Sequence, residues 1–302
     1  MHYGVLGVPS SAAAHGPGQE RGPAVLREAG LLEGMRAAGA LVTDHGDLPV
    51  VRWRPDPRQR NPHALDRVIA VLRAAADGVR RVLDGGTTPL VLGGECTLAI
   101  PLVTAVTRAS DGEPPALVYV DGGVDLRTPA DEPSGVLDSM GAAHLLDLPG
   151  TDDALASFGV RRPMLPPDHL VYVGHNDNPG PDEDALRSLP CAQFRADAVR
   201  ADPAGVAAAA VAAAAGVAER FVVHFDVDVI GFYELPVADV PLHNLGLTPE
   251  QAAAVLGALV AAPGFAGVTV CEFNPDHGAP DGSTARALTT ALAGALAGRP
   301  WP

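Results

Sequence analysis

The chain has 302 residues, of which 47% are hydrophobic, and its formal net charge is −15 at pH 7. This length and apolar content suffice for one large α/β domain, while the acidic balance argues against partners such as nucleic acid or an anionic membrane. The three cysteines, Cys96, Cys191 and Cys271, are too few and too dispersed for a disulfide framework. Because no basic segment followed by a long apolar one opens the chain, a cytoplasmic protein is expected.

Short apolar runs alternate with longer helical patterns along the chain. The predicted strands cover residues 3–8, 41–46, 89–93, 116–121, 169–174, 191–194, 220–228 and 266–272. The predicted helices cover residues 23–38, 62–84, 97–108, 203–218, 248–262 and 282–297. This alternation is typical of βαβ units and predicts a three-layer αβα fold with a mainly parallel, eight-stranded sheet. Since no linker or charge block divides the sequence, residues 1–302 are expected to form a single domain.

The predicted strand 220–228 is apolar and rich in β-branched and aromatic residues, yet it ends with two acids. Side chains alternate across a strand, so His224, Asp226 and Asp228 are expected on one face. Two acids at the end of a buried strand repel each other unless a cation or a proton lies between them. One such acid would be an ordinary turn residue, whereas two favour a metal or catalytic site. His224, one pleat deeper, is expected to make a supporting hydrogen bond rather than to bind a metal.

Polar residues also follow four other predicted strands. They are Gly-Gly-Glu-Cys at 93–96, Asp-Gly-Gly-Val-Asp at 121–125, Gly-His-Asn-Asp-Asn-Pro at 174–179 and Glu-Phe-Asn-Pro at 272–275. Ligands of open parallel sheets bind at the carboxyl ends of the strands, so these segments predict one site at that edge. Cys96 opens a helix there, and a metal ligand, a nucleophile and a small buried core residue are all open interpretations of it.

These motifs resemble the arginase/agmatinase (ureohydrolase) superfamily over nearly the whole chain. The resemblance implies a hydrolase that splits guanidino or related C–N bonds at a two-manganese centre, with a small-molecule substrate and assembly as a homo-oligomer. The family motifs Gly-Gly-Asp-His, Asp-Ala-His-x-Asp and Asp-x-Asp-x-x-Asp-Pro align with 93–96, 121–125 and the segment from 226 onward. Four metal-ligand carboxylates of these motifs match residue by residue: Asp121, Asp125, Asp226 and Asp228.

Both family histidines are absent from this sequence. Cys96 stands at the histidine of the first motif, and Gly123 stands at that of the second. Gly231 and Phe232 replace the final Asp-Pro of the third motif. The resemblance therefore implies a reduced centre, with one divalent ion or none. The ion would be Mn²⁺ by analogy, or Zn²⁺ or Fe²⁺ if Cys96 is a ligand.

The resemblance also assigns candidate substrate and catalytic residues. Glu272 aligns with the glutamate that faces the guanidinium group. The family segment Ser-Gly-x-x-His falls on residues 134–138, which makes Ser134 a candidate for substrate binding. Asp138 replaces the proton-shuttling histidine of that segment.

Two further substrate-binding candidates follow from the alignment. Arg127 replaces an asparagine that helps to bind a substrate carboxylate, and pairing with Asp125 or Asp131 is the alternative role for its side chain. Residues 174–179 resemble the loop that binds the substrate amine, which makes Asp177 a candidate.

Three functions are compatible with these residues. In the leading hypothesis, Glu272 orients a cationic guanidino, amidino or related substrate, Asp226 and Asp121 hold a metal that activates water, and Asp138 is a general acid. A second hypothesis is a repurposed, metal-independent acid–base catalyst such as a lyase or cyclase. The third is a non-catalytic homologue that binds a ligand or a partner.

Overall fold

Eight parallel strands form the centre of the computed structural model, which describes residues 1–58, 60–176, 180–240 and 245–298. The strands are β1 (His2–Gly7), β2 (Leu41–Asp47), β3 (Thr88–Leu92), β4 (Ala116–Val120), β5 (Leu170–Val173), β6 (Ala192–Phe194), β7 (Phe221–Asp226) and β8 (Phe265–Cys271). Their order in the sheet is β2-β1-β3-β8-β7-β4-β5-β6, and every pairing is parallel.

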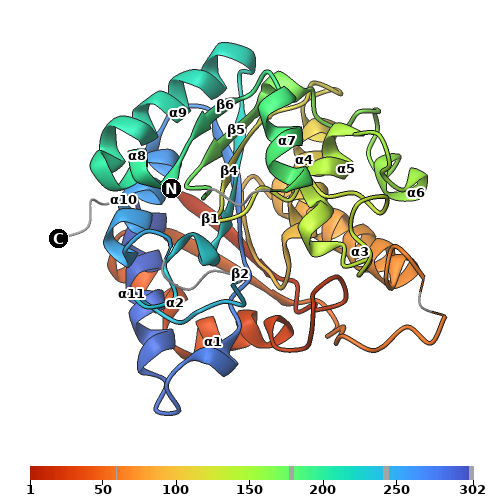
Figure 1. The fold of residues 1–302 in the computed structure, drawn as a ribbon. Coiled ribbons are helices and arrows are strands. Elements are labelled where there is room, and N and C mark those ends of the chain that lie inside the picture. The colour runs from red at the N-terminus through yellow and green to blue at the C-terminus, as the bar shows by residue number, and fades with distance from the viewer. Residues whose placement is uncertain (59, 177–179, 241–244, 299–302) are drawn as a thin grey trace.

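Helices cover both faces of this sheet (Figure 1). They are α1 (Gly22–Glu28), α2 (Leu31–Ala37), α3 (Leu65–Asp84), α4 (Ala99–Ala109), α5 (Gly141–Leu146), α6 (Asp153–Ala156), α7 (Pro181–Ser188), α8 (Ala196–Ala201), α9 (Pro203–Val217), α10 (Pro249–Ala261) and α11 (Ser283–Leu296). One apolar core joins the sheet to α1, α2 and α8–α11, and a second core joins the other face to α3–α7. The predicted αβα fold is therefore confirmed.

The central strands are buried on both faces, whereas the edge strands are not. Every residue of β4 and β7 is buried, and alternate residues of β4 pack into the two cores: Val118 into one, Leu117 and Tyr119 into the other. Strands rich in Val, Leu and Phe suit this position because both faces are apolar. The edge strand β2 is largely exposed, and its acids at Asp44 and Asp47 discourage pairing with another chain.

The structure differs from the sequence-based expectation at three places. Strand β7 ends at Asp226 and continues into a 3₁₀ turn at Val227–Val229, so the expectation that Asp228 shares a strand face with Asp226 was wrong. The predicted helix 23–38 is two helices, separated at Gly30, whose φ of 93° is accessible to glycine. Helices α5 to α8 were not predicted, because they have at most eight residues each and show little apolar periodicity.

The assignment of residues 1–302 to one domain stays a prediction. Within the described residues, no helix combines the length and apolarity that a membrane span requires.

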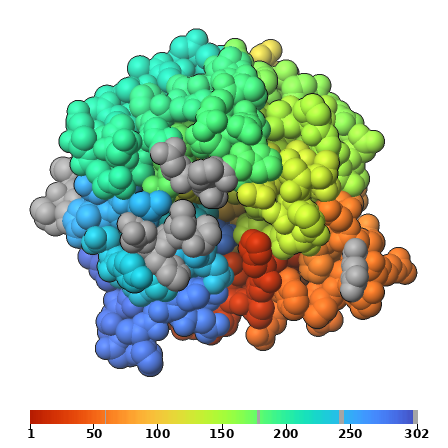
Figure 2. Space-filling model, in the orientation of Figure 1, coloured from red at the N-terminus to blue at the C-terminus, as the bar shows by residue number. Residues whose placement is uncertain are grey.

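The carboxyl ends of the strands lie at one edge of the sheet, where close backbone packing requires small residues. After β3 the chain turns through Gly93 and Gly94 past the segment that follows β1. A Cβ atom on Gly94 would lie 1.6 Å from the carbonyl oxygen of Ser10. Figure 2 shows that segments distant in sequence, coloured red, yellow-green and cyan, meet around a small hollow on one face of the molecule.

Replacing Gly94 by alanine should lower the free energy of unfolding by about 3 kcal/mol or more, because the added methyl group meets backbone atoms that cannot move independently. Gly294 in α11 is the matched control, since nothing lies within 4 Å of an added Cβ and Gly294→Ala should raise stability by about 0.5–1 kcal/mol. Urea denaturation measures both changes. Equal stability of Gly94→Ala and the parent would contradict the packing described here.

Candidate active site

Four neighbouring strands bring the candidate residues together. Strands β3, β8, β7 and β4 are adjacent in the middle of the sheet, and each ends in a polar segment. Cys96 follows β3 and starts a 3₁₀ turn that leads into α4. Glu272 follows β8, Asp226 ends β7, and Asp121 follows β4. The sheet order thus explains why residues far apart in the sequence share one site.

A group of four buried donors forms the middle of the site: Cys96, Asp121, His224 and Asp226. One donor atom from each of these side chains lies within 4.8 Å of all the others, and we call them the four-donor group. The Cys96 thiol donates a hydrogen bond to Asp226 Oδ2 at 2.8 Å. His224 Nε2 lies 3.2 Å from Cys96 Sγ. This group includes three of the five metal candidates predicted from the sequence.

His224 has a larger part in the site than the sequence indicated. Its Nδ1 lies 2.7 Å from Thr269 Oγ1, and its ring stacks on Tyr119 with a centroid distance of 4.4 Å. These contacts fix the ring so that Nε2 faces Cys96 and the acids. His224 is therefore a candidate ligand as well as a supporting residue. Its position two residues before Asp226, on the same strand face, is the signal that could have identified it.

The other two predicted metal ligands have separate partners. Asp125 accepts a hydrogen bond from the Tyr119 hydroxyl at 2.6 Å, and Asp228 accepts one from the Gly122 amide at 2.9 Å. Among the described residues, neither acid joins a group of three or more His, Cys, Asp or Glu donors within 4.8 Å. Asp125 and Asp228 therefore lie outside the four-donor group.

Gly123 explains why Asp121 and Asp125 have no further donor between them. A Cβ atom on Gly123 would lie 3.2 Å from Asp121 Oδ1 and 3.8 Å from Asp125 Oδ1. A longer side chain at this position would thus start between the two acids. The glycine leaves that place without a donor.

Glu272 and Asp138 lie on the other side of Cys96 and form a second set of donors with it. The Cys96 amide donates to Asp138 Oδ1 at 2.9 Å. Gln19 Nε2 donates to Glu272 Oε2 at 3.2 Å, whereas Glu272 Oε1 is buried without a hydrogen-bond partner. Glu272 has φ 67° and Asp125 has φ 49°, a left-handed conformation that is rare outside glycine and that often marks functional sites.

The acids of the site have no basic partner among the residues that the structure describes. The sequence contains no lysine, and within the described ranges no salt bridge reaches the six carboxylates Asp121, Asp125, Asp138, Asp226, Asp228 and Glu272. Burial, followed by repulsion from neighbouring acids, raises the pKa of Asp121, Asp226 and Glu272 well above the ordinary values. Burial raises the pKa of Asp138 to about 6 and that of Glu95 to about 7. The cluster therefore needs protons or a bound cation.

Burial also acts on the thiol and the imidazole of the four-donor group. It raises the pKa of the Cys96 thiol, and the nearby Asp226 raises it further. Burial lowers the pKa of His224 to about 3, so the imidazole is neutral at pH 7. Neutral imidazole is the form that binds metals.

The residues predicted to bind substrate differ in their positions and partners. Arg127 donates to Asp182 at 3.0 Å and to Glu132 at 3.2 Å, so its partners differ from the alternative pairing with Asp125 or Asp131. Asp182 belongs to α7, a helix that the sequence analysis did not predict.

Ser134 is exposed, and its hydroxyl accepts a hydrogen bond from the Val136 amide within a local turn. Asp177 lies outside the described residues. Gln19 was missed because a lone glutamine in an irregular segment carries no motif.

The four-donor group fits one divalent ion. A thiol, an imidazole and two carboxylates are a donor set that suits tetrahedral Zn²⁺, and an all-oxygen set that would favour Mn²⁺ is not what the structure presents. Asp121 Oδ2 is buried and has no hydrogen-bond partner. A bound cation would interact with this oxygen and so compensate for the missing hydrogen bond. A second ion lacks a comparable set of donors among the described residues.

Replacing Glu95 by glutamine should reduce the pH dependence of stability. The folded chain holds the Glu95 proton up to a pKa of about 7, whereas the unfolded chain releases it near the ordinary value of 4.5. The free energy of unfolding should therefore fall as the pH rises from 5 to 8, by about 3 kcal/mol from Glu95 alone. Glutamine resembles the protonated acid and removes this part of the fall.

Urea denaturation of chelator-treated protein at pH 5 and pH 8 measures the difference. Glu33→Gln, at an exposed position, is the control and should keep the parental pH dependence. The same pH dependence in Glu95→Gln and the parent would show that Glu95 is ionised in the folded protein at both pH values.

Comparisons with known proteins agree with this fold. Arginase-1 of Oryctolagus cuniculus is 29% identical over 302 residues, covering 97% of this chain and 91% of that relative. The solved structure of arginase from Bacillus subtilis superposes with a TM-score of 0.85 at 20% identity and covers 98% of both chains. Formimidoylglutamase from Bacillus subtilis superposes with a TM-score of 0.75 at 18% identity, covering 100% of this chain and 89% of that one. The family model described as "Arginase family" matches residues 1–298, and the chain therefore belongs to the arginase family.

Proposed function

We propose that this protein is a hydrolase that cleaves a C–N bond of a small guanidino, amidino or related nitrogen-rich substrate at a centre with one divalent ion. The observation that carries the proposal is the four-donor group, whose donor atoms lie within 4.8 Å of one another. The family supports the reaction class, since its members named here are arginases and a formimidoylglutamase. By the same resemblance we propose one ureohydrolase-like domain that assembles into a homo-oligomer.

Cys96, Asp121, His224 and Asp226 would hold the ion. The thiolate and the imidazole favour Zn²⁺ or Fe²⁺ over the Mn²⁺ that the family normally uses. When bound, such an ion lowers the pKa of water and so provides a nucleophile at neutral pH. Burial of the group excludes bulk water, which strengthens every electrostatic interaction within it.

Glu272 would bind the cationic part of the substrate. Its Oε2 is held by Gln19, and its buried Oε1 has no donor, so a guanidinium or amidinium N–H fits there. A bound cation would also keep this carboxylate ionised against the burial that raises its pKa. The left-handed backbone at Glu272 fixes the direction in which the side chain points.

Asp138 would serve as the general acid. Its pKa of about 6 leaves part of the population protonated near neutral pH, which suits transfer of a proton to a leaving amine. The Cys96 amide holds Oδ1, and Asp138 lies in one donor group with Glu272, the residue that would bind the substrate cation. Because Asp138 stands where arginases have a histidine, we expect slow turnover of arginine itself.

A second candidate function is metal-independent catalysis. The raised pKa of Asp138, about 6, favours it, since a carboxyl group that is partly protonated near neutral pH can exchange a proton with a substrate without a metal. Asp226 and Glu272 would then bind the substrate cation. Chelation distinguishes the two candidates, because only the first requires an ion.

Removing Cys96 and removing Glu272 should have separable effects. Cys96→Ala should weaken Zn²⁺ binding by more than about 100-fold, because it deletes a direct ligand. Glu272→Gln should keep about one ion per chain yet lower kcat/KM by about 10²-fold or more, because it weakens binding of the cationic group. Elemental analysis measures the ion content, and amine or ammonia release from L-arginine, agmatine and N-formimidoyl-L-glutamate measures turnover.

Cys191→Ser is the matched control, because that cysteine lies outside the site and should keep both ion content and turnover. Turnover that survives a chelator would favour the metal-independent candidate. A stoichiometric ion with no turnover on any such substrate would identify a non-catalytic homologue.

Restoring both histidines should restore a second ion. In Cys96→His/Gly123→His the new imidazole at 123 starts between Asp121 and Asp125, where the second ion lacks a donor. The φ of Gly123 is outside the left-handed region, so a side chain is compatible with the backbone there, with a shift of a few tenths of an ångström at Asp121. Calorimetric titration with Mn²⁺ should give about two ions per chain.

Cys96→His/Gly123→Ala is the control for this experiment, because it adds the same Cβ without a ligand and should bind at most one ion. A folded double-histidine variant with no more Mn²⁺ than this control would show that Asp125 and Asp228 cannot complete a second site.

A further inference from the structure

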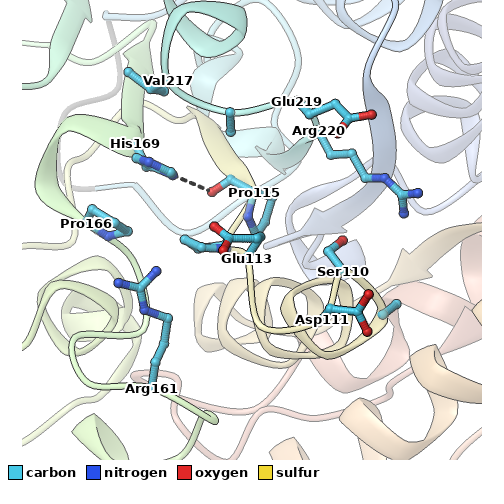
Figure 3. A pocket seen from close by; sticks show the side chains of 13 residues that line it. Ser110, Asp111, Glu113, Pro115, Arg161, Pro166, His169, Val217, Glu219 and Arg220 are labelled. Carbon is cyan, nitrogen blue, oxygen red and sulfur yellow. Dashed lines mark hydrogen bonds between the residues drawn. The ribbon is translucent and has the colours of Figure 1, made fainter.

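A cavity lies at the opposite edge of the sheet from the four-donor group. It has a volume of about 600 Å³ and opens at the amino ends of β4, β5 and β7, which are neighbouring strands. Its walls come from the α4–β4 connection, the segment that leads into β5, and the segment between α9 and β7 (Figure 3). We call it the amino-edge cavity. Its size is in the range of small-molecule sites.

Charged side chains of both signs line this cavity without pairing with one another. The cations are Arg161 and Arg220, and the acids are Asp111, Glu113 and Glu219. Within the described part of the chain, none of these five side chains takes part in a salt bridge or a side-chain hydrogen bond. Figure 3 shows Arg161 on one side of the cavity and Arg220 with Asp111 on the other, with Glu113 between them.

Neutral polar groups add directional contacts. Ser110 belongs to the lining of the cavity, and its Oγ is buried without a hydrogen-bond partner. His169 Nδ1 lies 3.2 Å from the Pro115 carbonyl oxygen, which fixes the ring and leaves Nε2 facing away from that contact (Figure 3). Pro115, Pro166 and Val217 provide apolar wall between these groups.

We propose that the amino-edge cavity is a binding site for a small zwitterion with an apolar body, such as a free amino acid. A ligand with only negative charge would bind the arginines but face three acids, and a purely cationic ligand would face two arginines. A zwitterion satisfies both, with its carboxylate toward an arginine and its ammonium toward Glu113 or Asp111. The proline and valine wall suits an aliphatic side chain.

The cavity shares its supporting elements with the candidate active site. Helix α4 begins just after Cys96 and ends next to Ser110, β4 runs from Ala116 toward Asp121, and β7 ends at Asp226. Strand β4 spans about 17 Å, so the two sites are separate. The proposal does not depend on the reaction that the other site performs.

Binding of L-leucine and of two analogues, each of which keeps one of its two charged groups, tests the proposal. Leucine carries both charges, 4-methylpentanoate carries only the carboxylate, and isopentylamine carries only the ammonium. Backbone-amide NMR of the full chain should show saturable shifts at residues 110–116 and 217–220 with leucine, with each analogue binding at least about threefold more weakly. The variant Glu113→Gln/Arg161→Gln removes one charge of each sign and leaves the net charge unchanged. It should weaken leucine binding by about tenfold.

The two single variants should change the ligand preference of the cavity in opposite directions. Glu113→Gln should improve binding of 4-methylpentanoate relative to leucine, whereas Arg161→Gln should improve binding of isopentylamine. Arg73→Gln, which changes an arginine of a different cavity, is the control and should leave leucine binding intact. Shifts that do not saturate, equal affinity for leucine and its two analogues, or unchanged binding by the double variant would each overturn the proposal.

Discussion

Burial of acids without a basic partner is the constraint on which this site depends. Two carboxylates about 4 Å apart repel by roughly 4 kcal/mol at an effective dielectric constant of about 20. Salt bridges elsewhere in the described structure pair arginines with acids, but they do not reach this cluster. Raised pKa values and a bound cation are the two ways to relieve the repulsion. The thiol and imidazole beside these acids make the cation the better-supported solution.

The parallel sheet explains how one site draws on distant parts of the chain. Because β3, β8, β7 and β4 are adjacent and parallel, their last residues meet at one edge. Each element then positions its donor rigidly, since β4 and β7 are buried along their whole length. Their opposite ends line the amino-edge cavity, so the same rigid elements support both sites.

The sequence alone predicted the parallel sheet and the edge at which the site lies, since both follow from short apolar runs and from the acids that come directly after them. All eight predicted strands are present, and Cys96 lies in one donor group with Asp121 and Asp226 and in another with Glu272. Sequence patterns did not predict the features that depend on contacts between distant parts of the chain. Asp228 leaves the strand face through a 3₁₀ turn, Arg127 pairs with an acid on an unpredicted helix, and His224 gains its place through Thr269 and Tyr119.

The two lost histidines have unequal consequences. At position 96 a cysteine still offers a donor, and His224 adds an imidazole, so the proposed ion would have four donors. At position 123 glycine offers nothing, and the adjacent acids are instead held by Tyr119 and by backbone amides. Softer donors at one position and none at the other would favour one borderline ion over two hard ions, which is the centre that we propose. In that proposed centre, Glu272 would orient the substrate and Asp138 would transfer the proton.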